Sequence, residues 1–229
     1  SASDPGVPSK PGCEPYSING TSWLVDVSSW LASGVVLSSP LTGARLVGAE
    51  AFPTSARVSV QTPSLEVRVS FARLPPLDGG LVPRAADDRI GYWDLRFTEV
   101  GTESGPLTDQ TTNRRVDVIH RWRLEPADKE LAAGDRLIAP AKPIPYHIAP
   151  SVPERWRKAM KLGVELWQPA FERAGWKDAI IAVAPGDEGF PEDYSAADSR
   201  YASISWAVST DRVYAVGPHS YDPRTGEIL

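Results

Sequence analysis

Cysteine and histidine are scarce in this sequence. Cys13 is the only cysteine among 229 residues, and the three histidines stand at positions 120, 147 and 219. A single cysteine excludes an intrachain disulfide and a cysteine zinc cluster. No two histidines have the one-turn helical spacing with which a pair on one helix face grips zinc.

Basic runs, nucleotide motifs and long apolar segments are also missing. Basic residues number 24 and acidic residues 29, the net charge is -5, and no basic run is longer than the two residues of Arg114-Arg115. This balance argues against nucleic acid as a partner. The longest uncharged stretch, residues 27–44, contains five serines and Pro40, so no transmembrane segment is predicted.

Proline, by contrast, is abundant. The chain has 22 prolines, with 41% apolar and 23% charged residues. The apolar and charged shares are typical of a soluble globular protein. Because proline cannot donate to a helix or sheet ladder, we expect many short elements joined by turns.

The first half has the pattern of an antiparallel β domain. Apolar and polar residues alternate over residues 65–71, which indicates a half-buried strand. Further alternating runs cover residues 57–62, 92–100 and 116–124, and residues 23–27 and 30–37 are apolar segments separated by serines. We therefore expect an extended N-terminal arm over residues 1–22 and a β-rich domain over residues 23–125.

The composition changes after Glu125. Residues 126–143 are rich in proline, alanine and charge, which is typical of a linker. A short strand at 144–148 precedes a helix that Ser151 and Glu154 are expected to begin as a capping box. Pro169 is expected to kink this helix near Glu165.

The last segment combines predicted strands with an acidic loop. Strands are expected at residues 179–184, 203–208 and 213–221, and residues 222–226 (Asp-Pro-Arg-Thr-Gly) favour a hairpin turn. The returning strand stops after three residues, so we expect further sequence to follow Leu229.

Several of these segments together resemble a family of zinc-dependent metallopeptidases related to the metzincins, known mainly from exported bacterial proteins. The resemblance extends from about Trp23 to Leu229 and rests on the order and spacing of its motifs. The motifs are Pro83-Arg84, Asp87–Tyr92, Arg121–Glu125, Lys142–Ile144, Gly163–Glu165, Trp167–Glu172, Ala174–Ala179, Asp198–Tyr201, Ile204, Trp206, Gly217-Pro218 and Asp222–Leu229.

The resemblance implies an α+β protein. Residues 144–229 form the upstream, incomplete part of a metzincin-like catalytic domain, with a mixed sheet and a backing helix. The family's zinc-binding H-E-x-x-H helix is absent, so zinc would belong to residues outside this chain, and the chain alone is expected to be inactive. The complete protein would hydrolyse peptide bonds in peptide or protein substrates.

The resemblance also places a sheet edge above the substrate cleft at about residues 215–221. An extended peptide can add to such an edge through its main-chain groups. We therefore predict that Gly217, Pro218, His219 and Ser220 help to bind peptide.

Other candidate sites have structural interpretations, which we favour. Isolated histidines are more often surface or core residues than metal ligands, so we favour structural roles for His120, His147 and His219. A catalytic triad of Ser220, His219 and Asp222 is not expected, because the sequence has no nucleophile-elbow motif. The acidic residues of the 187–198 loop could bind calcium, but their spacing favours a solvated loop. Most tryptophans are expected in the core.

Two alternatives to the peptidase fragment remain open. The chain could be a non-catalytic structural or binding subunit of a larger assembly, with a partner covering its sheet edge. It could also belong to a two-chain enzyme whose C-terminal catalytic fragment stays docked. The family's tendency favours a periplasmic or secreted location, and Asn19 fits the glycosylation pattern.

Overall fold

The computed structural model describes residues 16–18, 22–24, 43–63, 65–76, 81–100, 113–128, 137–209 and 213–229. The chain divides into two compact units, Ser1–Phe71 and Ala72–Leu229. Most of the predicted N-terminal arm, Cys13, Asn19 and the apolar segment 30–37 lie outside the described residues. The predicted boundaries near residues 22, 125 and 143 stay predictions.

The first unit consists of antiparallel strands. β1 (Tyr16–Ile18) pairs with β2 (Ser22–Leu24), and a three-stranded sheet has the order β3-β4-β5. These strands are β3 (Arg45–Ala51), β4 (Ser55–Gln61) and β5 (Glu66–Ala72). In β5, Val69 is buried between exposed Arg68 and Ser70, which confirms the alternation predicted from the sequence.

Strand β3 was missed by the sequence pattern. Its residues are mostly exposed, and its register with β4 shifts between Leu46 and Gly48. An exposed strand with an irregular register has no strict alternation of apolar and polar residues. Sequence periodicity therefore carries little signal for such a strand.

The second unit begins with the hairpin of β6 (Asp94–Val100) and β7 (Asn113–Ile119). The strands are antiparallel, and Asp94 lies opposite Ile119. Val118 and Ile119 are buried at the end of β7. The hairpin thus anchors the chain immediately before His120.

A parallel sheet follows, in the order β10-β8-β9. Its strands are β8 (Ile144–Ile148), β9 (Ile180–Val183) and β10 (Ala202–Ile204), and both pairings are parallel. The protein is therefore α+β. We expected a mixed sheet here, but the described strands of this sheet run in one direction, because α2 and α3 connect β8 to β9 and a long loop connects β9 to β10.

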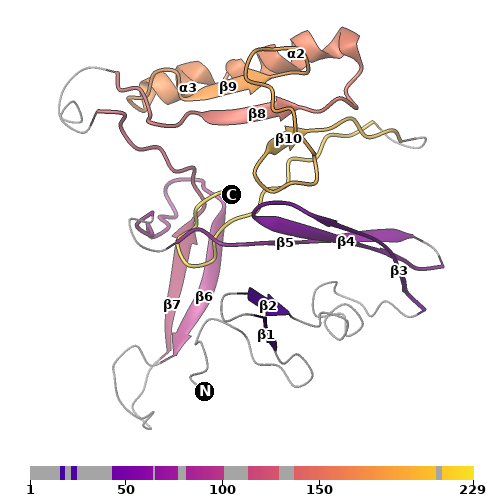
Figure 1. Ribbon diagram of the computed structural model, residues 1–229. Coiled ribbons are helices and arrows are strands. Elements are labelled where there is room, and N and C mark those ends of the chain that lie inside the picture. Colours follow the sequence, from indigo (N-terminus) through magenta and orange to yellow (C-terminus); the bar gives the residue numbers. More distant parts are fainter. Residues whose placement is uncertain are drawn as a thin grey trace. The chain divides into compact units, whose positions relative to one another are not determined.

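Two helices lie on one side of β8 and β9 (Figure 1). They are α2 (Glu154–Glu165) and α3 (Gln168–Arg173). The predicted helix therefore divides after Glu165, one turn before Pro169, whose ring cannot donate a helical hydrogen bond. No helix among the described residues is long and apolar enough to cross a membrane.

The predicted capping box is wrong. Pro153 occupies the N-cap position of α2 and makes no side-chain cap bond. The Ser151 hydroxyl instead accepts a hydrogen bond from the backbone N–H of Trp206, at 3.1 Å. Ser151 therefore fixes the chain that follows β10 rather than the start of the helix.

The core lies between α2 and the parallel sheet. Its buried residues form two groups: Ile144, Val164, Ile180 and Ala182, then Ile148, Val152 and Ala184. Truncating a fully buried aliphatic such as Ile148 to alanine should cost about 2–5 kcal/mol.

The tryptophans do not follow the expectation of core packing. Trp122 packs against the core. Trp93 is 77% exposed, Trp167 is 64% exposed, and Trp156 and Trp206 are also exposed. The expected apolar helix face is thus narrower than predicted, because Val164 is its only buried residue.

The two described ends of the segment 126–143 lie side by side. The Ala127 N–H donates to the carbonyl of Ala139, and the Ala141 N–H donates to that of Glu125. Ile138 forms a parallel bridge with Trp176. The described ends of this segment are therefore paired within the second unit.

The strand predicted at residues 213–221 is wrong. Residues 213–220 have no regular secondary structure and are exposed. Their β-branched and aromatic residues suggested a strand, but no strand pairs with them among the described residues. The turn predicted at residues 222–226 is confirmed, because Asp222 accepts the backbone N–H of Gly226 at 2.8 Å.

Candidate functional site: a histidine pair at the end of β7

The C-terminal turn docks against the end of β7. The Arg121 N–H donates to the carbonyl of Gly226, and the Ile228 N–H donates to that of Arg121, both at 3.0 Å. Tyr221 forms an antiparallel bridge with Ile228. These bonds bring residues 219–221 next to His120.

A buried aspartate closes the turn. Both carboxylate oxygens of Asp222, whose side chain is 2% exposed, accept hydrogen bonds from Arg224. The Arg224 side chain holds the pKa of Asp222 below its ordinary value. The charged hydrogen bonds between Asp222 and Arg224 therefore hold the turn in one conformation.

Gly226 permits the close approach of the turn to β7. Its φ is +74°, and a Cβ atom at this position would lie 2.2 Å from the carbonyl oxygen of Ile119. Only glycine tolerates both conditions. A side chain here would push the C-terminal segment away from β7.

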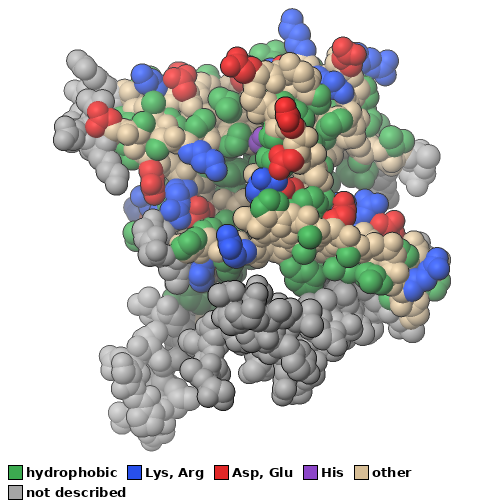
Figure 2. Space-filling view, in the orientation of Figure 1, with side chains coloured by type: hydrophobic (Ala, Val, Ile, Leu, Met, Phe, Trp, Pro, Cys, Tyr) green, Lys and Arg blue, Asp and Glu red, His purple; other side chains and the backbone are tan. Residues whose placement is uncertain are grey.

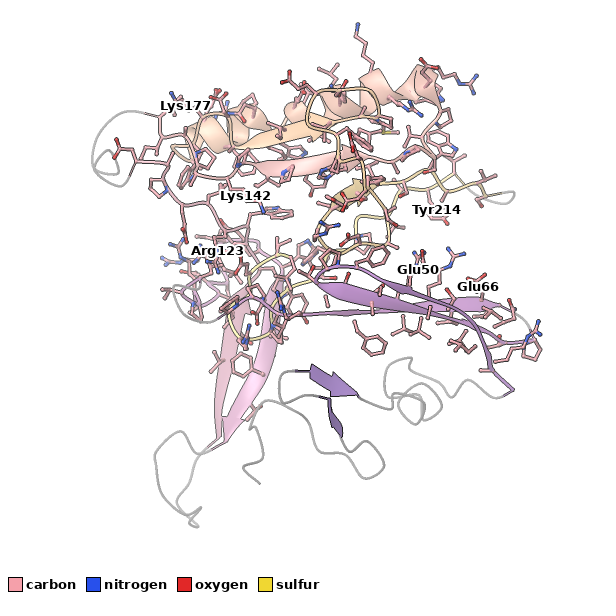
Figure 3. All side chains as sticks on the ribbon, in the orientation of Figure 1. Glu50, Glu66, Arg123, Lys142, Lys177 and Tyr214 are labelled. Carbon is pink, nitrogen blue, oxygen red and sulfur yellow. The ribbon has the colours of Figure 1, made fainter. Side chains whose placement is uncertain are left out.

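Arg123 and Glu227 form a second clamp between the same two segments. The guanidinium donates to both carboxylate oxygens of Glu227, at 2.8 and 2.6 Å. Figure 3 labels Arg123 on the segment that follows β7. This forked geometry fixes both the distance and the orientation of the two segments.

The imidazole rings of His120 and His219 are in contact between the two segments that this charged pair joins. Nδ1 of His120 and Nε2 of His219 are 2.8 Å apart. Tyr221 stacks on the His120 ring with centroids 3.9 Å apart, and the Trp93 ring lies 6.3 Å from that of His219. His120 is also tied to the residue before β6, because its backbone N–H donates to the carbonyl of Trp93.

The two histidines have different environments. His120 is 8% exposed, and its Nε2 atom has no hydrogen-bond partner among the described residues. Burial lowers the pKa of His120, and the neighbouring His219 lowers it further. His219 is exposed, so solvent reaches one member of the pair and not the other.

The structure brings only one of the four predicted peptide-binding residues into this site. His219 contacts His120, whereas Gly217 and Pro218 are exposed and Ser220 uses its carbonyl to accept the Leu229 N–H. The peptide-binding role of residues 217–220 stays a prediction. His120 was given only a structural interpretation, because a partner 99 residues away leaves no local signal.

The remaining histidine is a core residue. His147 lies among the rings of Phe190, Tyr194 and Tyr201, and its Nδ1 atom is 3.3 Å from the carbonyl oxygen of Ala202. Burial lowers its pKa. The structural interpretation given to His147 therefore agrees with its surroundings.

Three of the five carboxylates of the 187–198 loop have cationic partners. Lys161 pairs with Asp187, and Arg200 pairs with both Asp193 and Asp198. These three carboxylates are therefore already engaged by cationic side chains. The calcium prediction remains untested, and these pairings do not favour it.

The described residues contain no group of three or more histidine, cysteine, aspartate or glutamate side chains arranged to hold a metal ion. They therefore do not fit the three-ligand site of a catalytic zinc. Acidic and basic side chains are mixed on the face shown in Figure 2, which carries no broad patch of one sign.

An apolar groove lies beside α2. Its volume is about 350 Å³, and its lining residues are Tyr146, Ala159, Met160, Gly163, Val164, Trp167 and Ile204. The groove thus runs between the helix and strands β8 and β10.

Comparison with known proteins gives one match. Residues 25–127 match the model of a family described as a domain of unknown function, DUF5117. The matched region contains His120, whereas His219 and the parallel sheet lie beyond it. No curated protein and no solved structure matches the chain.

Proposed function

We propose that this chain is part of a zinc-dependent metalloendopeptidase of the metzincin-related type. In this proposal residues 144–229 supply the first strands and the backing helix of the catalytic domain, and the zinc ligands stand on other residues. Residues 217–220 would contact the peptide substrate. A periplasmic or secreted location belongs to the same proposal.

The observation that carries the proposal is the apolar groove beside α2. Parallel sheets are normally covered on both faces. Here α2 packs against β9 and β8, while Ile204 of β10 lines the groove with the half-exposed face of α2. A second helix packed beside α2 would cover this surface, and the resemblance implies that such a helix carries the H-E-x-x-H motif.

The contacts of the resemblance residues give further support. The Gln168 side chain accepts the Ala179 N–H at 3.1 Å, so it connects the start of α3 with the start of β9. Asp198 with Arg200, Asp222 with Arg224, and Arg123 with Glu227 each form charged hydrogen bonds. These residues hold loops and strand ends in place, as a supporting scaffold requires.

No catalytic step is assigned to the described residues, because they offer no set of zinc ligands. In the complete enzyme zinc would polarise the substrate carbonyl and lower the pKa of a bound water. The contribution of this chain would be to position the peptide and to seat the active-site helix.

The test compares the product of the complete reading frame with the 229-residue chain. We expect the complete protein to cleave a protein substrate, a chelator to abolish cleavage, and added Zn²⁺ to restore it. The chain alone should be inactive. A reading frame without H-E-x-x-H, or a folded complete protein without chelator-sensitive cleavage, would contradict the proposal.

A pair of variants tests the groove in the complete protein. Trp167→Glu places a charge in the groove and should lower activity about tenfold or more, because it displaces the packed helix. Trp156→Glu is the matched control, since Trp156 is also an exposed tryptophan of the helix region but does not line the groove. Equal effects of the two substitutions would argue against a helix seated there.

The alternative of a non-catalytic binding or structural subunit makes the opposite prediction. A partner protein would then cover the exposed surface, and no H-E-x-x-H motif would occur in the reading frame. A stable complex with that partner, isolated without zinc, would favour this alternative.

A further inference from the structure

Arg84 and Arg121 lie on neighbouring segments of the second unit. Ala85 forms an antiparallel bridge with Val118, and the Ile119 N–H donates to the carbonyl of Arg84 at 3.0 Å. Arg84 is therefore opposite Ile119, and Arg121 follows Ile119 two positions later. Long side chains in such a diagonal arrangement across an antiparallel pair are within reach of each other.

The Arg121 side chain is partly buried and only partly satisfied. Its Nη2 atom donates to the carbonyl of Val82 at 2.7 Å. Its Nε–H is buried and has no hydrogen-bond partner among the described residues. Burial lowers the pKa of Arg121, and the positive charge of Arg84 lowers it further. Because arginine stays protonated in proteins, Arg121 holds its charge in a partly buried place with one donor unsatisfied.

The nearby acidic side chains are engaged by other arginines. Glu227 is close enough to favour the charge of Arg121, but both its carboxylate oxygens accept hydrogen bonds from Arg123, which Figure 3 labels. In the part of the chain that the structure describes, no carboxylate forms an ion pair with Arg84 or Arg121. The remaining acids of the adjoining segments are paired as follows: Asp87 with Arg89, and Asp117 with Arg96.

Two guanidinium groups without a carboxylate partner are suited to an oxyanion. Arg121 can still donate through Nη1 and the second hydrogen of Nη2, and the exposed Arg84 adds a complete set of donors. Phosphate and carboxylate groups have the oxygen spacing that a guanidinium fork matches. The neighbouring charged pairs are neutral as pairs, so the excess positive charge is confined to two side chains. This arrangement fits a single oxyanion rather than a polyanion such as nucleic acid.

We propose that Arg84 and Arg121 form a binding site for the oxyanion group, a phosphate or a carboxylate, of a small ligand. Arg121 is the inner donor, which the Val82 carbonyl holds in place. Arg84 is the outer donor and leaves the ligand open to solvent. The bound anion supplies the counter-charge that the described carboxylates do not provide. The site uses neither zinc nor the groove beside α2, so it goes beyond the proposed peptidase function.

The site is tested by NMR on the isotope-labelled 229-residue chain. Inorganic phosphate is titrated in one series and the dicarboxylate succinate in another, with ionic strength held constant by sodium chloride so that screening does not register as binding. We expect saturable shifts of the Arg84 and Arg121 Nε–H signals, with a Kd of about 1 mM or below for the better oxyanion. Tighter binding of phosphate assigns a phosphate ligand, and tighter binding of succinate assigns a carboxylate ligand.

A pair of variants separates the site from the general charge of the chain. Arg84→Gln removes a guanidinium from an exposed position, so the fold is retained, and it should raise Kd at least about tenfold. Arg89→Gln is the matched control, because Arg89 is a highly exposed arginine of the same segment that is already paired with Asp87. It should change Kd less than about twofold. Arg84→Lys should restore only part of the affinity, since lysine keeps the charge but not the fork.

The opposite results are equally clear. No saturable shift with either oxyanion up to about 50 mM would overturn the site. Equal losses of affinity in Arg84→Gln and Arg89→Gln would also overturn it, because they would show a response to net charge alone. Neither zinc nor peptide enters this titration, so its failure leaves the peptidase proposal intact, and a complete protein without peptidase activity leaves the anion site intact.

Discussion

An aspartate two positions before an arginine closes a small ring of hydrogen bonds at three places in the second unit. In each ring the Asp carboxylate accepts the backbone N–H and the guanidinium of the arginine. The pairs are Asp87 with Arg89, Asp198 with Arg200, and Asp222 with Arg224. They differ in burial, because Asp87 is 41% exposed while Asp198 and Asp222 are almost fully buried.

Because these pairs differ in burial, we expect replacing the aspartate by asparagine to destabilise the protein more in a buried pair than in an exposed one. Asp222→Asn should lower the free energy of unfolding by about 2 kcal/mol, because hydrogen bonds to a charged group are lost in a buried place. Asp87→Asn is the matched control and should have no measurable effect, since its pair is screened by water. Urea unfolding at pH 7 measures both. A similar loss for the two variants would show that burial does not decide the strength of these rings.

Because His147 is buried, we expect the free energy of unfolding to depend on pH. Burial sets its pKa below the ordinary value of 6.5, so the unfolded chain binds more protons than the folded chain just below pH 6.5. The free energy of unfolding should therefore fall as the pH decreases from about 6.5.

His147→Gln should flatten this slope without removing it, because the pKa of His120 is lowered as well. Urea unfolding at a series of pH values from 7.5 to 5 gives the two slopes. An unchanged slope in the variant would mean that His147 does not titrate as a buried group.

At the scale of elements, the sequence predicted some strands well and others poorly, for physical reasons. Strand β8 and the break after Glu165 agree with the predictions, because a strict local pattern or a proline marks them. The alternation in β5 was equally visible. Residues 213–221 were predicted as a strand, but β propensity alone does not provide a neighbouring strand to pair with.

Only part of the candidate site could be predicted from the sequence. The turn at residues 222–226 has local turn chemistry and was predicted. The contact between His120 and His219 depends on how the end of β7 meets that turn, and no periodic pattern encodes such a meeting. Gly226 was noticed as a turn residue, whereas its approach to the Ile119 carbonyl is a tertiary property.

Gly226→Ala tests the two reasons for a glycine at this position, which are its positive φ and its close approach to the Ile119 carbonyl. The substitution adds a positive-φ penalty and a clash with the Ile119 carbonyl, so we expect a loss of about 3 kcal/mol or more in the free energy of unfolding. Gly175→Ala is the control, because φ is +93° there but no atom lies within 4 Å of the added Cβ. It should cost about 1 kcal/mol.

The comparison is made by thermal unfolding followed by circular dichroism. Equal losses for the two variants would indicate that the C-terminal turn moves aside at little cost.

Ser151→Ala tests the observed role of this serine against the predicted one. The loss of its bond to Trp206 should lower the free energy of unfolding by about 1 kcal/mol. Trp206 fluorescence should change, while the amide exchange of the first turn of α2 should not. Faster exchange at Arg155 and Trp156 would instead support a capping role.

At the scale of the whole molecule, two compact units predict two unfolding transitions. Val60→Ala in β4 and Val164→Ala in α2 remove buried side chains from different units. Each should shift only one transition, because each unit has its own buried residues. Calorimetry of the wild type and both variants measures this, and a single transition that both variants shift equally would show one cooperative fold.

The bond between Arg123 and Glu227 joins residues that are 104 positions apart in the sequence. On the ribosome, the end of β7 emerges long before its partner has been translated. In the nascent second unit, Arg123 and the buried His120 therefore lack their partners until the turn at residues 222–226 has been made, and such long-range contacts slow folding and expose the chain to chaperones in the meantime.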